Sequence, residues 1–130
     1  MTNNQTLPSK QLILEIGTNK YPINFPNNSA YIDIQAMRHS IAGNPGLYSS
    51  MATSNEGAGQ YASLTIDMIA TFNVLIGNQL KKDMTIKSLL DLGMYETRQL
   101  IDAYTDQYLP WYNQWMQIIT NPKVDEETTK

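Results

Sequence analysis

The first hydrophobic pattern in the chain alternates with a period of two. Residues 12–25 read LILEIGTNKYPINF, with apolar side chains at every second position on either side of the break GTNK. This alternation indicates two β-strands with one apolar face, and Gly17 and Asn19 tolerate the positive φ that a short hairpin connection needs. Because Pro22 has no N–H, we expect the second strand to lie at a sheet edge. The pattern predicts a β-hairpin over residues 12–25, whose apolar face carries Leu12, Leu14, Ile16, Tyr21, Ile23 and Phe25.

After the hairpin the apolar positions follow the helical period. Residues 60–78 place apolar side chains at spacings of three and four around most of the circumference, which is typical of a central, buried helix. Asn28 or Ser29 is expected to cap an earlier helix that Gly43 ends, although YIDI at 31–34 also permits a strand. We predict helices at about 30–42, 60–78, 86–92, 94–108 and 110–119.

Two positions set the expected boundaries of the later helices. Thr85 precedes residues 86–92 and is expected to cap them. Pro110 has no N–H, and it either kinks one long helix or starts a new one; we favour the new helix.

These elements predict a single α+β domain over residues 11–120, mostly helical, with an N-terminal β-hairpin packed on a bundle of about four helices. Residues 1–10 are polar and contain Pro8, and we expect a flexible arm there. Residues 121–130, NPKVDEETTK, are expected to be a disordered tail. The segment 43–59 holds four glycines and is expected to be a long loop with room for one helical turn.

Candidate catalytic groups are few. His39 is the only histidine, and a helix residue without a chemical role is the better interpretation. Asp102 and Asp106, with Glu96 before them, could serve acid–base or metal chemistry. They lie opposite the apolar stripe of the predicted helix 94–108, however, which indicates a face exposed to solvent. The acidic run at 125–127 lies in the expected tail and offers no fixed cage for a cation. We predict no catalytic residue, no metal site and no cofactor.

The composition excludes several further classes. The glycine-containing stretches GNPG and NEGAG lack the lysine and hydroxyl of a phosphate-binding loop. The net charge is −3 and the longest basic run is the pair Lys81–Lys82, which disfavours nucleic-acid binding. No cysteine is present, so disulfides and thiolate metal sites are excluded. No apolar run reaches the roughly 18 residues that span a bilayer, and we expect neither a signal segment nor a membrane partner.

The C-terminal aromatic residues are the most suggestive feature. Five aromatic side chains fall between residues 104 and 115, at Tyr104, Tyr108, Trp111, Tyr112 and Trp115. Core packing is the simplest interpretation. Trp and Tyr are also enriched in protein–protein contacts, so an exposed part of this aromatic ridge would be a docking face. Seven methionines fit an adaptable surface or core filling equally well.

The order of elements resembles that of phage tail assembly chaperones, which are small α+β proteins. ILEIGTNKYPINF, residues 13–25, resembles their N-terminal hairpin pattern x-IxIxGKxYxIxF, and LLDLGMYE, residues 89–96, resembles their late helical step F/W-x-x-L-T-x-x-E. The similarity covers about four-fifths of the chain in element order. The long loop and the aromatic C-terminal segment depart from the pattern.

The resemblance implies a non-enzymatic protein that coats the tape measure protein and recruits tail tube subunits in the host cytoplasm, with self-association and a longer frameshifted form as further expectations. A hairpin edge could then be shared with a partner by strand addition. The predicted contacts are Ile16, Tyr21, Ile23, Phe25, Tyr104, Tyr108, Trp111 and Trp115. The alternatives are a virion structural protein such as a connector, neck or tail component, an unrelated protein-interaction adaptor, and a small enzyme with an acid–base pair in a pocket.

Overall fold

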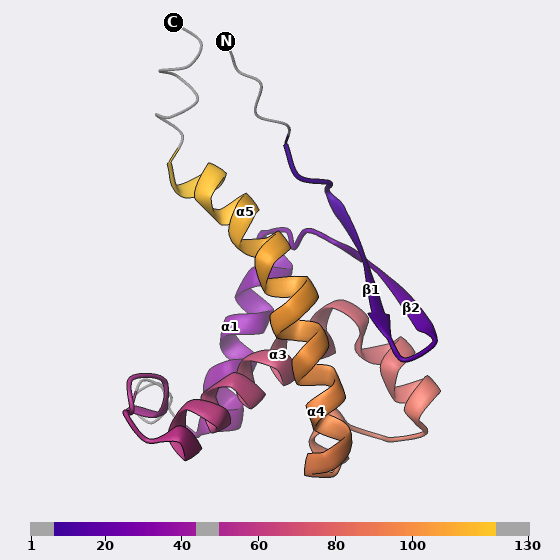
Figure 1. The fold of residues 1–130 in the computed structure, drawn as a ribbon, viewed down its shortest axis with the longest axis vertical. Coiled ribbons are helices and arrows are strands. Elements are labelled where there is room, and N and C mark those ends of the chain that lie inside the picture. The colour runs from indigo at the N-terminus through magenta and orange to yellow at the C-terminus, as the bar shows by residue number, and fades with distance from the viewer. Residues whose placement is uncertain (1–6, 44–49, 122–130) are drawn as a thin grey trace, which may run out of the picture.

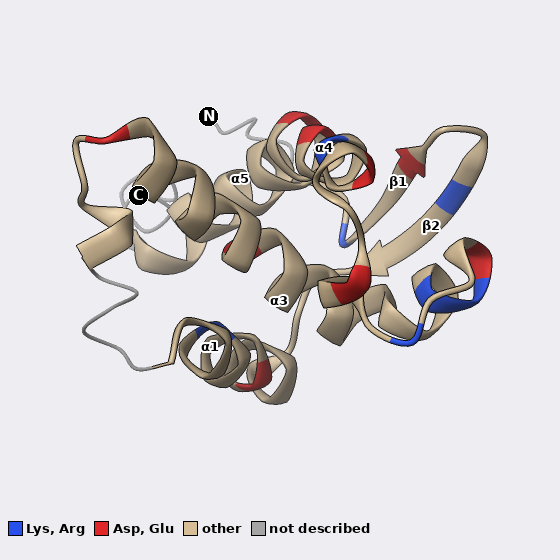
Figure 2. Ribbon diagram, turned by 90° about the horizontal axis from the view of Figure 1, so that it is seen from below, with Lys and Arg blue, Asp and Glu red and all other residues tan. Residues whose placement is uncertain are grey.

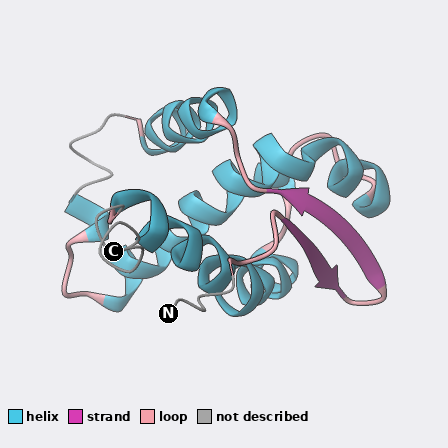
Figure 3. Ribbon diagram, turned by 90° about the horizontal axis from the view of Figure 1, so that it is seen from above, coloured by secondary structure: helices cyan, strands magenta, loops and turns pink. Residues whose placement is uncertain are grey.

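The computed structural model describes residues 7–43 and 50–121, and it consists mainly of helices beside one antiparallel hairpin (Figures 1 and 3). The elements are β1 (Gln11–Ile16), β2 (Asn19–Asn24), α1 (Asn28–Ala42), α3 (Gly57–Met84), the 3₁₀ turn η1 (Leu89–Asp91), α4 (Met94–Ala103), the π-helical turn η2 (Tyr104–Tyr108) and α5 (Leu109–Thr120). The predicted fold class, a mostly helical α+β domain with an N-terminal hairpin, is confirmed.

The hairpin is tighter than predicted. Ile16 pairs with Asn19, so only Gly17 and Thr18 connect the strands, and Asn19 and Lys20 belong to β2 rather than to the turn. Gly17 takes a φ of 61°, which suits the first position of a two-residue hairpin turn. The expected apolar face is formed: four of its side chains, Leu14, Ile16, Tyr21 and Ile23, are buried.

Helices α1 and α3 pack against each other, and β2 also contacts α3. The cap of α1 is Asn27, one residue before the predicted Asn28, because the Asn27 Oδ1 accepts the Ala30 N–H at 2.8 Å. Residues 31–34, for which a strand was an alternative, are helical. Gly43 ends the helix as expected, with a φ of 100° and its N–H donated to the His39 carbonyl.

Helix α3 extends beyond the predicted range of 60–78 at both ends. Its backbone is non-helical at Ile76 (φ −140°, ψ 22°), which marks a kink. At its end Thr85 adopts the left-handed conformation (φ 57°), and the next N–H, of Ile86, bonds to the Lys81 carbonyl at 3.0 Å. This pattern closes a helix C-terminus. Thr85 therefore ends α3 and does not cap the predicted helix 86–92, where only the single turn η1 forms behind Ser88.

Helices α4 and α5 are joined through η2 into one continuous rod (Figure 1). Pro110 lies in the first turn of α5 (Leu109–Thr120), as favoured, but the predicted interruption of the chain between the two helices is wrong. The turn before it is π-helical, and the Leu109 N–H bonds to the Tyr104 carbonyl five residues earlier. A wider turn at this point leaves room for the proline ring, which would otherwise clash with the carbonyl four residues earlier.

The hydrophobic core lies between the hairpin, α3 and the rod formed by α4, η2 and α5. Phe72 of α3 is fully buried, and its ring meets Tyr104 and Tyr108 edge-on at centroid distances of 5.8 and 6.3 Å. Because the hairpin contributes its whole apolar face to the same core, it is held by the helices rather than by its own two strands, which are marginal alone.

Candidate functional site

Most of the predicted contact residues are core residues of the chain itself. Six of the eight are at most 8% exposed, namely Ile16, Tyr21, Ile23, Tyr104, Tyr108 and Trp111. Their side chains offer no docking surface in this fold. For these six residues the prediction of partner contacts is wrong, and core packing, the simplest interpretation of the ridge, holds for most of its length. Phe25 and Trp115 are only partly buried, so the two predicted segments retain one surface residue each.

The ridge is a stack of rings that begins in the core and reaches the surface. Tyr104 stacks on Tyr108, Tyr108 on Tyr112 and Tyr112 on Phe25, with centroid distances of 5.5, 5.4 and 5.5 Å. The two tryptophans lie beside Phe25, at 5.6 Å for Trp111 and 5.5 Å for Trp115. The hairpin and α5 are therefore joined mainly through aromatic rings.

Burial in this stack shifts the tyrosine pKa values. Loss of solvent raises the pKa of Tyr108 far above its usual range, and the neighbouring Tyr112 and Tyr104 add to the effect. The pKa of Tyr112 is also raised by burial. For Tyr104 burial and the Asp67 carboxylate raise the pKa, while Arg38 and Thr71 oppose the shift. All three phenols are thus held in their neutral form.

A cleft opens where the stack meets the surface. It has a volume of about 450 Å³ and is lined by Lys10, Asn24, Phe25, Trp115 and Ile119. Ile119 is 52% exposed at the end of α5, and the indole N–H of Trp115 is donated to the Ser9 carbonyl at 2.9 Å. We call these five residues the hairpin–α5 cleft. Lys10, Asn24 and Ile119 were not among the predicted site residues, although Ile119 follows the ridge directly in sequence.

Each edge of the hairpin is blocked at one position, which disfavours the expected sharing of a strand edge. On β1 the side chain of Gln107 accepts the Glu15 N–H at 2.8 Å and donates to the Glu15 carbonyl at 2.7 Å. Along an antiparallel ladder the backbone N–H and C=O groups of successive residues point alternately toward the partner strand and outward. Those of Ile13 therefore point outward, as those of Glu15 do. On the outer edge of β2, Pro22, the partner of Ile13, has no N–H. Side-chain caps and edge prolines are common ways of preventing strand addition.

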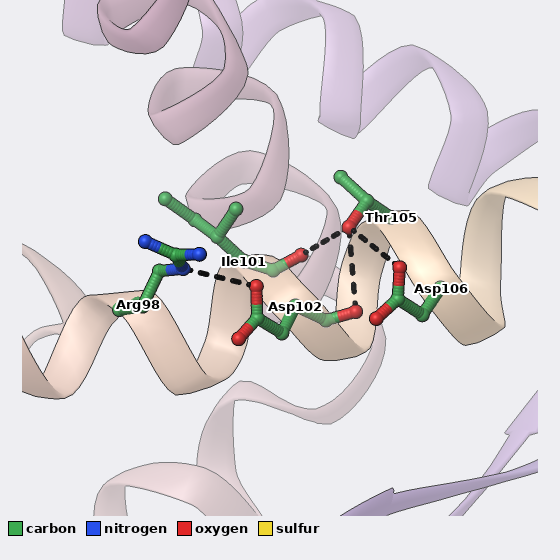
Figure 4. A network of polar contacts seen from close by, with 5 residues as sticks. All are labelled: Arg98, Ile101, Asp102, Thr105 and Asp106. Atoms are coloured by element: carbon green, nitrogen blue, oxygen red, sulfur yellow. Dashed lines mark hydrogen bonds and ion pairs between the residues drawn. The ribbon is translucent and has the colours of Figure 1, made fainter.

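The titratable groups are arranged as the sequence indicated. His39 lies part-buried on α1, and Glu96, Asp102 and Asp106 are exposed. Asp102 accepts from Arg98 at 3.1 Å, and the Thr105 hydroxyl donates to the Ile101 carbonyl at 3.1 Å (Figure 4). The acidic run at 125–127 lies outside the described residues. Within residues 7–43 and 50–121, no group of three or more His, Cys, Asp or Glu side chains could hold a metal ion.

Sequence reasoning missed one ion pair. The Arg38 Nε lies 3.0 Å from the Asp67 Oδ1 between α1 and α3, and both side chains are largely shielded from solvent. Tyr104 lies close enough for both groups to act on its pKa. An Arg and an Asp at unrelated positions carry no pattern that could have revealed this pairing.

Comparison of the chain with protein-family models, curated proteins and solved structures gives no match. Among the described helices, none has both the length and the apolar character that crossing a membrane requires.

Proposed function

We propose that this chain is a non-enzymatic phage tail assembly chaperone, which shields an apolar segment of a tape measure or tail tube protein in the host cytoplasm until the tail assembles. The observation that supports this function best is the hairpin–α5 cleft. It joins the hairpin, which carries the resemblance, to the aromatic C-terminal segment, and its floor is the partly exposed pair Phe25 and Trp115.

The cleft suits an apolar chain segment for physical reasons. Ile119 stands half exposed beside the rings, and covering such surface is favourable by about 25 cal/mol per Å². The rings are held in place by stacking and by the indole bond to Ser9. A client would therefore bind a surface that is already arranged, with little loss of side-chain entropy.

Co-expression with the tape measure or tail tube protein of the same genome tests the proposal. We expect the chain to raise the soluble yield of its client and to co-purify with it. Ile119→Asp should remove most of this effect, because it places a charge in the cleft. Ile32→Asp is the matched control, since Ile32 is also a helical isoleucine, is 63% exposed and lies on α1. Equal loss in both variants, or a client that stays soluble without the chain, would contradict the proposal.

Mass spectrometry of purified particles separates this function from that of a virion structural protein. A chaperone leaves before the particle is complete, so its peptides should be absent from mature virions. Stoichiometric recovery from virions would favour the structural alternative.

A further inference from the structure

A second apolar groove runs between the first half of α3 and the segment formed by η1 and the start of α4. Its floor repeats at helical spacing along α3, with the side chains of Ala58, Tyr61, Ala62, Thr65, Ile66 and Ile69. The opposite wall is Leu89, Leu90, Leu92, Met94 and Thr97, Ile41 of α1 also lines the groove, and the volume is about 610 Å³. This groove is separate from the hairpin–α5 cleft and shares no lining residue with it.

The rim of the groove exposes large apolar side chains. Leu90 is 55% exposed, Met94 77% and Tyr95 90%. Single exposed apolar residues are ordinary, but adjoining ones beside a groove mark an interaction site. Met94 and Tyr61 line both this groove and a hollow along α4, so the two adjoin, and Tyr95 adds an exposed ring to the second.

The shape of the floor fits a helix. The stripe from Ala58 to Ile69 covers three turns, or about 17 Å. Ala58 and Ala62 have small side chains, so little projects from the first turns of this stripe. Small side chains allow two helix axes to approach to about 8 Å. A helix that presents apolar residues at i, i+3, i+4 and i+7 would match this stripe.

The charges around the groove favour a partner of positive charge. Glu96 and Asp102 line its continuation along α4, where Arg98 is the cation and already pairs with Asp102. Near the groove, though not in its lining, Asp91 and Glu56 are exposed, and Lys87 is exposed two residues before Leu89. The acidic groups outnumber the basic ones. Figure 2 shows acidic positions beside a basic one on α4, whereas basic positions are more frequent on the hairpin and near the end of α3, where acidic positions also occur. An acidic rim attracts a basic partner and disfavours a second copy of itself.

We infer that the groove between α3, η1 and α4 is a docking site for an amphipathic helix of another protein that carries Lys or Arg beside its apolar stripe. The inference does not depend on the proposed chaperone function, because a different surface carries it.

Two synthetic peptides of about four helical turns test this inference by fluorescence anisotropy with the full chain. Both carry leucines at i, i+3, i+4 and i+7, one flanked by lysines and the other by glutamates. The lysine peptide should bind and the glutamate peptide should not. Tyr95→Ala should weaken binding by about threefold or more and Ala62→Arg by about tenfold or more, while thermal melting shows whether each variant remains folded.

Two charge-reversal variants distinguish an effect at the groove from an effect of the chain's net charge. Glu96→Lys should weaken binding of the lysine peptide by about threefold or more at low salt. Asp33→Lys on α1 makes the same change in net charge and should leave the affinity of this peptide nearly unchanged. Equal weakening by both, binding of both peptides, or no binding at all would overturn the inference. Dimerisation lost in Ala62→Arg, observed by sedimentation, would instead identify a second copy as the occupant. Ile119→Asp should leave peptide binding intact, so the two sites fail independently.

Discussion

At the scale of single residues, one backbone carbonyl organises the C-terminal aromatic segment. The indole N–H groups of Trp111 and Trp115 both donate to the Ser9 carbonyl, at 2.6 and 2.9 Å. Buried indoles need such a partner, and two residues at i, i+4 on one helix can share it. The sequence places the tryptophans on one face but gives no sign that Ser9 is their acceptor. Ser9 and Lys10 were expected in a flexible arm; instead Ser9 is fixed by the indoles and the Lys10 carbonyl accepts from Phe25. Residues 1–6 lie outside the described residues.

Tyr21 illustrates a residue whose pH dependence follows from its contacts. Its hydroxyl donates to the Asp83 Oδ2 at 2.6 Å, and burial, with Asp83 beside it, raises its pKa to about 12. The folded chain therefore holds this proton more tightly than the unfolded chain, where the pKa is about 10. The resulting stabilisation is complete below pH 10 or so and is lost as the pH rises toward the folded pKa.

We expect Tyr21→Phe to lower the free energy of unfolding near neutral pH by about 1 kcal/mol, the usual contribution of one hydrogen bond. The gap between variant and parent should narrow as the pH rises above about 10, as measured by urea unfolding at a series of pH values. Tyr95→Phe is the control and should match the parent throughout, since Tyr95 is 90% exposed. A gap that stays constant up to the highest pH at which the chain folds would contradict this account.

At the scale of elements, the π-helical turn is the feature that sequence reasoning could not supply. Pro110 is a strong break signal, and the helical period on both sides of it is clear. Whether the chain breaks or widens by one residue depends on tertiary packing of the turn, here by Phe72 against Tyr104 and Tyr108. The same turn carries Gln107, whose side chain covers the outer edge of β1.

Removing this cap should loosen the hairpin. In Gln107→Ala the N–H and carbonyl of Glu15 lose both bonds and are left to water. This should cost about 1 kcal/mol of unfolding free energy and speed hydrogen exchange at Glu15. The uncovered edge should also promote self-association, which sedimentation would detect. Gln114→Ala, at an exposed position of α5, is the comparison and should change neither property. Unchanged exchange at Glu15 would show that the cap contributes nothing.

At the scale of the whole molecule, the sequence predicts most of the architecture because its two periodicities are clear. The alternation in 12–25 and the wide apolar arc of 60–78 are both present, as the hairpin and as α3. The failures are local: Thr85, which was expected to begin the helix at 86–92, instead ends α3 in the left-handed conformation. Threonine rarely adopts that conformation, so no residue pattern announces it.

The candidate site was less predictable than the fold. Aromatic density located the ridge, but exposure depends on which side chains other elements bring to it. Phe72 and the hairpin cover Tyr104 and Tyr108, whereas Ile119 at the end of α5 is 52% exposed. The cleft also draws on Lys10 and Asn24, far away in sequence and without a shared motif. Contacts of this kind become visible only once the tertiary arrangement is known.

The central claim is that the chain acts by covering an apolar segment of another protein at the hairpin–α5 cleft. Hydrogen exchange of the purified chain, alone and in complex with its tape measure or tube client, tests this most directly. We predict added protection at residues 9–11, 24–25 and 112–120, with α1 unchanged. A client that binds with protection confined to other surfaces, or a client that produces no protection at all, would contradict the claim.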